Sequence, residues 1–307
     1  MNTSLPLVHI IVITFNGKRH LEYCFRALAR TTYGNYQVML ADNGSVDGAP
    51  EYVEANFPAC RVVRNGANLG FAGGNNAAIR VSLSEHAEYI VLLNDDTAVL
   101  DPEWLSRAVT VAEANSSIGM LGFEIVNGKG EYDPSLDVQH TSSSIALSYV
   151  PRIEGCALFM RASVLQQIGL LDEIYFMYAE EDDLEMRAIR AGYKLGSINS
   201  AIYHAGGATS KKYPATISYY EARNYLRFGL KNLGPFYAVR RFLTLFDILC
   251  NPFPLVHRKE NAAHVRMRSS GPLTTNFVIY CRAVFWNLAH LAETLSLRFA
   301  RPKLVTE

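Results

Sequence analysis

The sequence lacks the features that mark several large classes of protein. Its five cysteines are odd in number, widely scattered and without a C-x-x-C pair, so neither a zinc site nor a disulfide framework is indicated. No uncharged apolar run reaches the roughly 18 residues of a membrane span, and no basic segment with a cleavage site opens the chain. We therefore expect a cytoplasmic protein in a reducing compartment.

Net charge is also absent, although the charges are unevenly distributed along the chain. Charged residues make up 19% of the sequence and hydrophobic residues 49%, which is typical of globular domains. Residues 231–307 carry 11 Lys and Arg against 4 Asp and Glu, and the remainder carries 18 against 25. This basic C-terminal region favours an anionic surface as a partner, and no motif of a nucleic-acid reader accompanies the charge.

Apolar, β-branched runs alternate with helical patterns over the first hundred residues. Strands are predicted at Leu7–Phe15, in the stretch YQVMLADNGS, at Cys60–Asn65 and at Tyr89–Leu93. Helical patterns follow each of them, as expected of βαβ units. The alternation predicts an α/β fold with a mostly parallel central sheet flanked by helices.

Capping residues predict the ends of two further helices. Asp101 is expected as the N-cap of a helix with Pro102 at its first position. A later helix is predicted over Glu180–Ala191, ended by Gly192 in the left-handed conformation.

Polar side chains stand at three of the predicted strand ends: Thr14 to Asn16, Asp42 to Ser45, and Asn94 to Asp96. Ligands bind beyond the carboxyl ends of parallel strands, so we expect the three groups to form one site. The two adjacent acids of the last group repel each other, and with His204 they are adequate ligands for Mn²⁺ or Mg²⁺. The alternative is a helix-capping loop with solvated acids.

Four consecutive acids, Glu180 to Asp183, open the later helix. The helix macrodipole tolerates acids there, so a well-capped surface helix explains them, with Asp183 close enough in sequence to pair with Arg187. Alternatively, crowding raises the pKa of one carboxylate and supplies a general base near neutral pH, in which case the titration belongs to the cluster.

A glycine-rich stretch, NLGFAGGNN, spans Asn68 to Asn76. It matches neither the dinucleotide fingerprint nor the Walker motif, so the standard cradles for those ligands are not indicated. Glycines at the start of a helix allow close approach of a ligand to the backbone. A plain loop-to-helix joint is the alternative.

Eight motifs occur in a characteristic order over residues 7–230: VITFNG, LADNGSVDG, NLGFAGGNN, LLNDDT, GCALFMR, FMYAEEDDLEMRAIRAGY, YHAGG and YYEARNYLRF. In this set and order the chain resembles family 2 glycosyltransferases, most closely the bacterial rhamnosyltransferase-like members. The resemblance implies the GT-A fold, which is Rossmann-like, and metal-dependent transfer of a sugar from a nucleotide diphosphate with inversion at the anomeric carbon.

The resemblance also implies roles for individual residues. Asn94-Asp95-Asp96 occupies the D-x-D position of the family with Asn first, so Asp96, His204 and, more weakly, Asn94 would hold Mn²⁺ or Mg²⁺. The residues implied to bind the nucleotide are Thr14, Phe15, Asn16, Asp42, Asn43, Ser45, Asn68, Gly70, Gly73 and Asp95, with Asp47 completing a loop.

The catalytic base of the family lies in an acidic E-D-x-D motif, where this chain has Glu181 in place of the usual Asp. Glu181 is therefore the implied base, with Glu180 as the reserve choice and Asp183 as the last acid of the motif. The residues implied to contact donor or acceptor are Gly155, Cys156, Tyr220, Arg223 and Asn224.

We expect a catalytic domain over residues 1–230, with a nucleotide-binding half to about residue 100 and an acceptor half from about 101. The region 231–307 is expected to be a helical extension in which aromatic residues interleave with basic ones: Arg240, Arg241, Arg258, Lys259, Arg266 and Arg268. Such a segment suits an anionic membrane interface, with a packed helical subdomain or a dimer interface as the alternative.

The leading functional hypothesis is an inverting glycosyltransferase of bacterial surface polysaccharide synthesis, peripheral on the inner face of the cell membrane. Its first-choice donor is dTDP-rhamnose, and its acceptor would be a saccharide or a lipid-linked saccharide. The alternatives are a UDP-hexose-dependent transferase of the same family, a sugar nucleotidyltransferase and a non-catalytic carbohydrate-binding scaffold.

Overall fold

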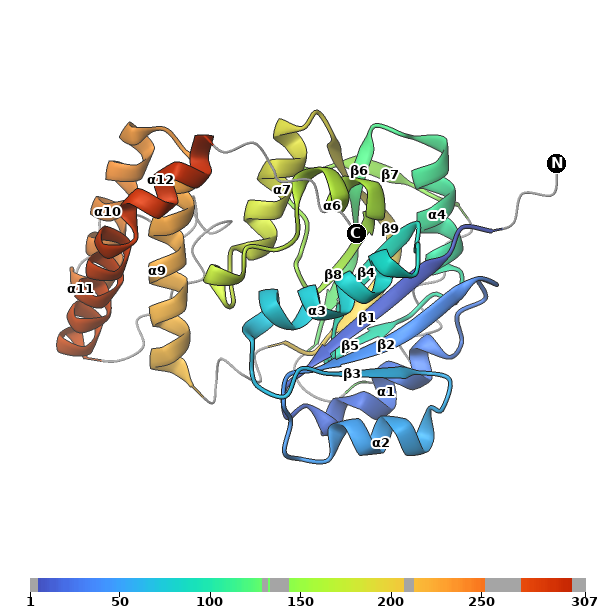
Figure 1. Ribbon diagram of the computed structural model, residues 1–307. Helices are drawn as coiled ribbons and strands as arrows, with labels where there is room; N and C mark the ends of the chain where they lie inside the picture. Colours follow the sequence, from blue (N-terminus) through green and yellow to red (C-terminus); the bar gives the residue numbers. More distant parts are fainter. Residues whose placement is uncertain (1–4, 129–131, 133–143, 207–212, 252–271, 300–307) are drawn as a thin grey trace. The chain divides into compact units, whose positions relative to one another are not determined.

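The structure is a computed structural model that describes residues 5–128, 132, 144–206, 213–251 and 272–299. The chain forms two compact units (Figure 1). The first comprises residues 1–173, 184–206 and 302–307, and the second comprises residues 174–183 and 207–301. Four of the residues predicted in the basic extension, from Arg258 to Arg268, lie outside the described residues.

In the part of the chain that the structure describes, the first unit is built on a nine-stranded sheet with the strand order β3-β2-β1-β4-β8-β6-β9-β5, in which β7 also pairs with β9. Strands β3, β2, β1 and β4 pair in parallel, whereas β8 is antiparallel to both of its neighbours. The strands are β1 Val8–Thr14, β2 Tyr36–Asp42, β3 Arg61–Arg64, β4 Tyr89–Asn94, β5 Thr97–Val99, β6 Ile118–Asn127, β7 Leu147–Tyr149, β8 Ala157–Arg161 and β9 Lys194–His204.

Helices cover both faces of this sheet (Figure 1). The alternation of side chains along β1 sends Ile10 and Val12 into one apolar cluster with α1, α2 and α4, and Ile11 into a second cluster with α3, α6 and α7. The helices are α1 Lys18–Leu28, α2 Ala49–Asn56, α3 Gly70–Ser84, α4 Trp104–Ala114, α6 Ala162–Ile168 and α7 Glu180–Arg190, whose first turn belongs to the second unit.

One predicted helix boundary is confirmed and the other is wrong. Gly192 has φ +94°, Tyr193 N donates to Ala188 O, and Gly192 N donates to Ile189 O, which is a Schellman motif after α7. Helix α4 begins at Trp104 rather than Pro102, because the Pro102 carbonyl accepts the backbone N–H of Thr32 instead of a helical one.

The described part of the second unit is largely helical, as predicted for the C-terminal extension. Its helices are α9 Pro214–Asn232, α10 Pro235–Cys250, α11 Leu273–Ala289 and α12 Leu291–Phe299. They enclose a small apolar core that includes Leu226, Leu245 and Leu249. The predicted boundary at residue 230 falls inside α9. Over the described ranges, no helix combines the length and hydropathy needed to cross a bilayer.

Candidate active site

Three polar strand ends meet at one edge of the sheet. β1 lies between β2 and β4, and all three run parallel. In this register Thr14 is the partner of Asp42, and Ile13 is the partner of Asn94. The polar groups that the sequence places after three separate strands are therefore neighbours in the fold.

The loops after β1 and β2 are joined by reciprocal hydrogen bonds. Asn16 N donates to Ser45 Oγ at 2.9 Å, and Asn16 Oδ1 accepts from Val46 N at 2.8 Å. Lys18 N donates to Asp47 Oδ2 at 2.9 Å. Asn16 adopts the left-handed conformation with φ +56°, which Asn tolerates better than most residues. The two loops therefore form one ordered rim.

Asp42 and Asn43 bond to the protein itself. The buried Asp42 carboxylate accepts the backbone N–H of Ser45 at 3.1 Å. Asn43 Nδ2 donates to Gly70 O at 2.9 Å, and its Oδ1 accepts from Asn65 Nδ2 at 3.0 Å. These side chains fix the β2 loop against the start of α3.

The glycine-rich stretch forms the turn into α3. Asn68 Oδ1 accepts from Gly70 N at 2.9 Å, and Gly70 has φ +72°, a conformation that favours glycine. A Cβ at Gly73 would lie 2.9 Å from the Leu69 Cβ, which is too close, so a residue with a side chain does not fit there unless Leu69 moves. Phe15, at the end of β1, remains 44% exposed.

Asp95 lies against the loop after β1. Its Oδ2 accepts from Thr14 Oγ1 at 2.6 Å, and a Cβ placed on Gly17 would meet the same oxygen at 1.8 Å. Burial raises the pKa of Asp95 to about 7, the Thr14 hydrogen bond opposes the shift, and the neighbouring Asp96 adds to it.

Asp96 and His204, far apart in sequence, are brought together because β5 pairs with the end of β9. His204 Nε2 lies 3.3 Å from Asp96 Oδ1, and Gly206 N donates to Asp96 Oδ2 at 3.2 Å. Burial alone would lower the pKa of His204, but hydrogen bonds to Asp96 and Cys156 raise it to about 10. Burial would raise the pKa of Asp96, yet His204 holds it below its usual range.

Gly155 and Cys156 precede β8 and lie beside the same strand end. The backbone carbonyl of Cys156 accepts from Asn94 N at 3.0 Å, and the side chain of Cys156 is buried. Gly155 is half-buried. The predicted sugar-contacting pair is thus next to the predicted metal ligands.

The donor set at this edge suits a hard divalent cation. Within the described ranges, no group of three or more His, Cys, Asp and Glu side chains is placed to hold a metal ion. Asp96 and His204 are a pair and supply two donors. The buried Oδ1 of Asn94 has no hydrogen-bond partner in the part of the chain that the structure describes. Carboxylate and amide oxygens fit Mn²⁺ or Mg²⁺ once phosphate and water complete the shell, and His204 would join them after losing the proton that its raised pKa retains.

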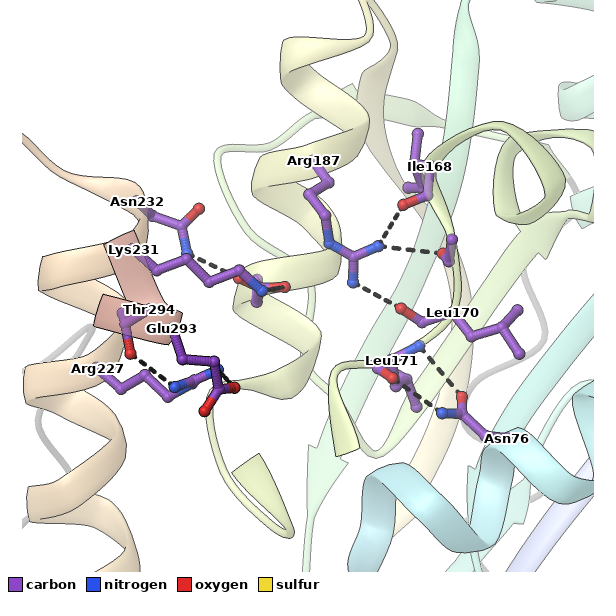
Figure 2. A network of polar contacts seen from close by, with 12 residues as sticks. Asn76, Ile168, Leu170, Leu171, Arg187, Arg227, Lys231, Asn232, Glu293 and Thr294 are labelled. Carbon is purple, nitrogen blue, oxygen red and sulfur yellow. Dashed lines mark hydrogen bonds and ion pairs between the residues drawn. The ribbon is translucent and has the colours of Figure 1, made fainter. Parts of the chain in front are cut away.

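The acidic cluster belongs to the second unit and is largely buried. Glu180 is 3% exposed and Asp183 is 0% exposed, so the interpretation as a solvated surface helix is wrong at these positions. Lys231 Nζ lies 3.0 Å from Asp183 Oδ2, and Asn232 Nδ2 donates to Asp183 Oδ1 at 2.8 Å (Figure 2). Burial raises the pKa of Glu180 well above its usual range, and Glu181 adds to the shift.

Arg187 of α7 binds the turn that follows α6. Within the first unit its guanidinium donates to the carbonyls of Ile168 and Leu170 at 2.7 Å each (Figure 2). In the same unit Asn76 exchanges two hydrogen bonds with the backbone of Leu171. These contacts hold the turn after α6 in place.

Tyr220, Arg223 and Asn224 lie on α9 in the second unit. Arg223 Nη2 donates to Tyr175 O at 2.7 Å, and Asn224 Nδ2 donates to the same carbonyl at 2.9 Å. The Tyr220 ring lies 4.7 Å from the Arg223 guanidinium carbon. Tyr220, Arg223 and Asn224, the three side chains of α9 predicted to contact donor or acceptor, thus have partners within the chain.

Sequence reasoning missed Gly17, Lys231 and Asn232. Gly17 stands in the quoted VITFNG motif, but nothing in that motif reveals the contact with Asp95. Lys231 was counted only as a charge, although its side chain is 8% exposed and paired. Lys231 lies two helical turns after Arg223 and Asn224 on the same face of α9, and this spacing could have indicated that its side chain faces the same segment.

Comparison with known proteins decides the family. The family model described as Glycosyl transferase family 2 matches residues 9–168, just over half of the 307 residues. The chain belongs to glycosyltransferase family 2. The N-acetylglucosaminyl-diphospho-decaprenol L-rhamnosyltransferase of Mycobacterium tuberculosis is 25% identical over 271 residues, which cover 76% of this chain and 87% of that protein. The predicted family is confirmed.

Solved structures show the same fold as this glycosyltransferase. The mannosyltransferase PcManGT of Pyrobaculum calidifontis, in complex with GDP-Man and Mn²⁺, has a TM-score of 0.60 at 16% identity, covering 96% of this chain and 86% of that one. TarS of S. aureus in complex with UDP-GlcNAc has a TM-score of 0.57 at 15% identity, covering 95% and 89%. The predicted GT-A fold with C-terminal helices is confirmed.

Proposed function

We propose that this glycosyltransferase moves a sugar, with inversion, from a nucleotide diphosphate donor to a lipid-linked saccharide of a bacterial surface polysaccharide. The observation that carries the proposal is the Asp96–His204 pair at 3.3 Å, beside the joined loops of the parallel strand ends. A relative acts on a decaprenol-linked acceptor according to its name, and it is a rhamnosyltransferase. We therefore take dTDP-rhamnose as the first candidate donor.

The first unit would bind the nucleotide and diphosphate. The rim formed by Asn16 and Ser45 and the turn at Gly70 flank the strand ends, where ligands of such sheets bind. Phe15 offers an exposed ring against which a base can stack. A Mn²⁺ or Mg²⁺ ion held by Asp96 and His204 would offset the charge of the diphosphate.

Glu181 is the side chain that we assign as the general base. A base must be ionised and open to the acceptor hydroxyl whose proton it takes. Glu180 is 3% exposed and its raised pKa keeps it protonated over a wider pH range, whereas Glu181 is half-buried. Removal of the hydroxyl proton lets the oxygen attack the anomeric carbon as the diphosphate departs.

The second unit would meet the membrane that carries a lipid-linked acceptor. Helices α10 and α11 expose large apolar side chains. Phe236, Leu243, Phe277 and Phe285 are 74%, 67%, 51% and 70% exposed, respectively. Exposed cations on the same two helices include Arg240 and Arg282. An apolar surface with basic residues suits an anionic lipid interface. Flotation with vesicles of anionic lipid tests this step, and failure to bind at low salt would refute it.

Calorimetric titration with dTDP, UDP and GDP, with and without Mn²⁺ or Mg²⁺, tests the proposed function first. We expect one nucleotide to bind only with metal, and Asp96→Ala to abolish that binding. A UDP-linked hexose is the second candidate donor, because solved neighbours hold UDP-GlcNAc and UDP. Failure of a folded protein to bind any of the three would refute the proposal and favour a non-catalytic scaffold.

A further inference from the structure

The segment before the acidic cluster has an unusual backbone. Phe176, Tyr178 and Ala179 have φ values of +64°, +70° and +71°, all in the left-handed region that residues with a Cβ rarely adopt. Such a conformation persists only where surrounding contacts impose it, and it concentrates at functional sites. Contacts of the surrounding chain must therefore impose it on this segment.

Two adjacent side chains of α9 bind this segment through its carbonyls. Asn224 Nδ2 lies within hydrogen-bond distance of three carbonyl oxygens, which share its two hydrogens: Tyr175 O at 2.9 Å, Met177 O at 2.7 Å and Tyr178 O at 2.8 Å. Arg223 Nη2 donates to Ile174 O at 2.8 Å and to Tyr175 O at 2.7 Å. The Arg223 Nε in turn donates to Asn224 Oδ1 at 2.8 Å, which fixes the orientation of the amide.

Helix α11 holds Arg223 from behind. The Trp286 ring lies 4.5 Å from the guanidinium carbon, and the Tyr220 ring lies 4.7 Å from it. Asn287 Nδ2 donates to the backbone carbonyl of Arg223 at 2.9 Å. Arg223 is 6% exposed, and Asn224 and Asn287 are fully buried. The guanidinium is therefore committed to carbonyls and rings of the protein.

The last acid of the cluster is held by the C-terminal end of α9. Lys231 and Asn232 bind the two oxygens of Asp183, at 3.0 and 2.8 Å (Figure 2). Side chains of α9 therefore bind the chain both before and after Glu180 and Glu181. These contacts all lie within the second unit.

We propose that α9 and α11 form a bracket that holds segment 174–183, and that Arg223 and Asn224 are positioning residues for the base rather than ligands of the donor. The proposal rests on the proposed function, because it takes Glu181 as the base. The bracket gives the C-terminal helices a part in the reaction even though they lie beyond the match to the family model.

Asn224→Ala tests the bracket, with Leu249→Ala as its matched control. Leu249 is 1% exposed in the apolar core of the same unit and is not among the side chains that bind segment 174–183, so its truncation loosens the helices without cutting the bracket. Arg223→Lys is the second variant, since a lysine keeps the cation but loses the planar fork.

The kinetic readout separates positioning from folding. For Asn224→Ala we expect kcat to fall about 100-fold, the size of effect that a misplacement of about 1 Å produces, while the dissociation constant of the nucleotide stays unchanged. Arg223→Lys should lose less than Asn224→Ala, and Leu249→Ala should keep its kcat below its unfolding temperature. Equal losses of kcat in Asn224→Ala and Leu249→Ala, or weaker nucleotide binding in Arg223→Lys, would overturn the proposal.

Hydrogen exchange supplies a readout that does not need activity. Peptides that cover residues 174–183 should exchange faster in Asn224→Ala than in the wild type, whereas peptides that cover β1 should exchange at the same rate in the two proteins. If the wild type transfers no sugar but this difference is seen, the proposed function fails and the bracket stands as a structural feature. If exchange in residues 174–183 is unchanged, the bracket itself is refuted.

Discussion

Replacing Gly17 with alanine is the sharpest test of the acidic strand end. Gly17 has φ −106°, a value open to residues with a side chain, so alanine adds no backbone strain there. The new Cβ would lie 1.8 Å from Asp95 Oδ2 and 2.8 Å from Thr14 Oγ1. Since real contacts of this kind are not shorter than about 3 Å, the Asp95 carboxylate has to move by more than 1 Å.

That movement breaks the hydrogen bond of 2.6 Å between Thr14 and Asp95. Hydrogen bonds to charged groups contribute about 1.5–3 kcal/mol to stability. Replacing glycine with alanine also restricts the unfolded chain, which returns about 0.4–1 kcal/mol. We therefore expect Gly17→Ala to lower the free energy of unfolding by about 1–2 kcal/mol. Nucleotide binding should weaken as well, because Asp95 adjoins the predicted metal ligand Asp96.

Urea unfolding and calorimetric nucleotide binding measure the two effects. Gly34→Ala is the matched control, because the contact that its Cβ would make among the described residues is with Leu5 at 3.4 Å, an ordinary distance. The control should be neutral or slightly stabilising. If Gly17→Ala is as stable as Gly34→Ala and binds nucleotide equally well, the close packing of Gly17 on Asp95 does not hold the Asp95 carboxylate in place, and the reasoning is refuted.

Three further changes test the acidic cluster. Lys231→Met should lower the free energy of unfolding by about 3–5 kcal/mol, since it removes the cation that lies 3.0 Å from the buried Asp183 carboxylate, and Asp183→Asn in the same chain should restore part of the loss. Urea unfolding of the two variants decides this, and an unchanged stability in Lys231→Met would contradict it. Glu180→Gln should become more stable than the wild type as pH rises. The folded-state pKa of Glu180 lies above its ordinary value, so the native state binds a proton that the unfolded state has lost. The free energy of unfolding of the wild type therefore falls by about 1.4 kcal/mol for each pH unit from about pH 4.5 up to the raised pKa. Thermal unfolding at pH 5 and pH 8 measures the difference, and an equal gain at both values would argue against a buried, protonated Glu180. Glu181→Gln should abolish sugar transfer while the affinity for nucleotide is kept, and full transfer activity in that variant would remove Glu181 as the base.

The fold of the nucleotide half was predictable because its signals are local. The strands that became β1, β2 and β4 are apolar, β-branched runs, and each stops at polar residues. Parallel pairing then brings those ends together without further information. The same holds for Gly192, where a left-handed residue closes a helix with its own backbone bonds.

Other features depended on partners distant in sequence. The start of α4 differs from the prediction because Thr32, 70 residues away, donates to the Pro102 carbonyl. For the acids of α7 the sequence leaves two interpretations open: a capped surface helix with Arg187 one turn from Asp183, and a crowded cluster that supplies a base. Asp183 is buried instead, against Lys231, 48 residues further along. Propensity and spacing do not contain such pairings, because tertiary packing creates them.

The polar face of α9 has one physical explanation. Residues 176–179 lie outside regular helix and strand, and left-handed residues among them prevent their carbonyls from joining a ladder. A buried carbonyl without a donor costs free energy, so a segment of this kind needs donors from elsewhere. Asn224 and Arg223 provide them from consecutive positions of a helix, where apolar residues would normally be expected. The motif YYEARNYLRF is therefore explained by the hydrogen bonds that this backbone requires, and any part in catalysis follows from the segment that it holds.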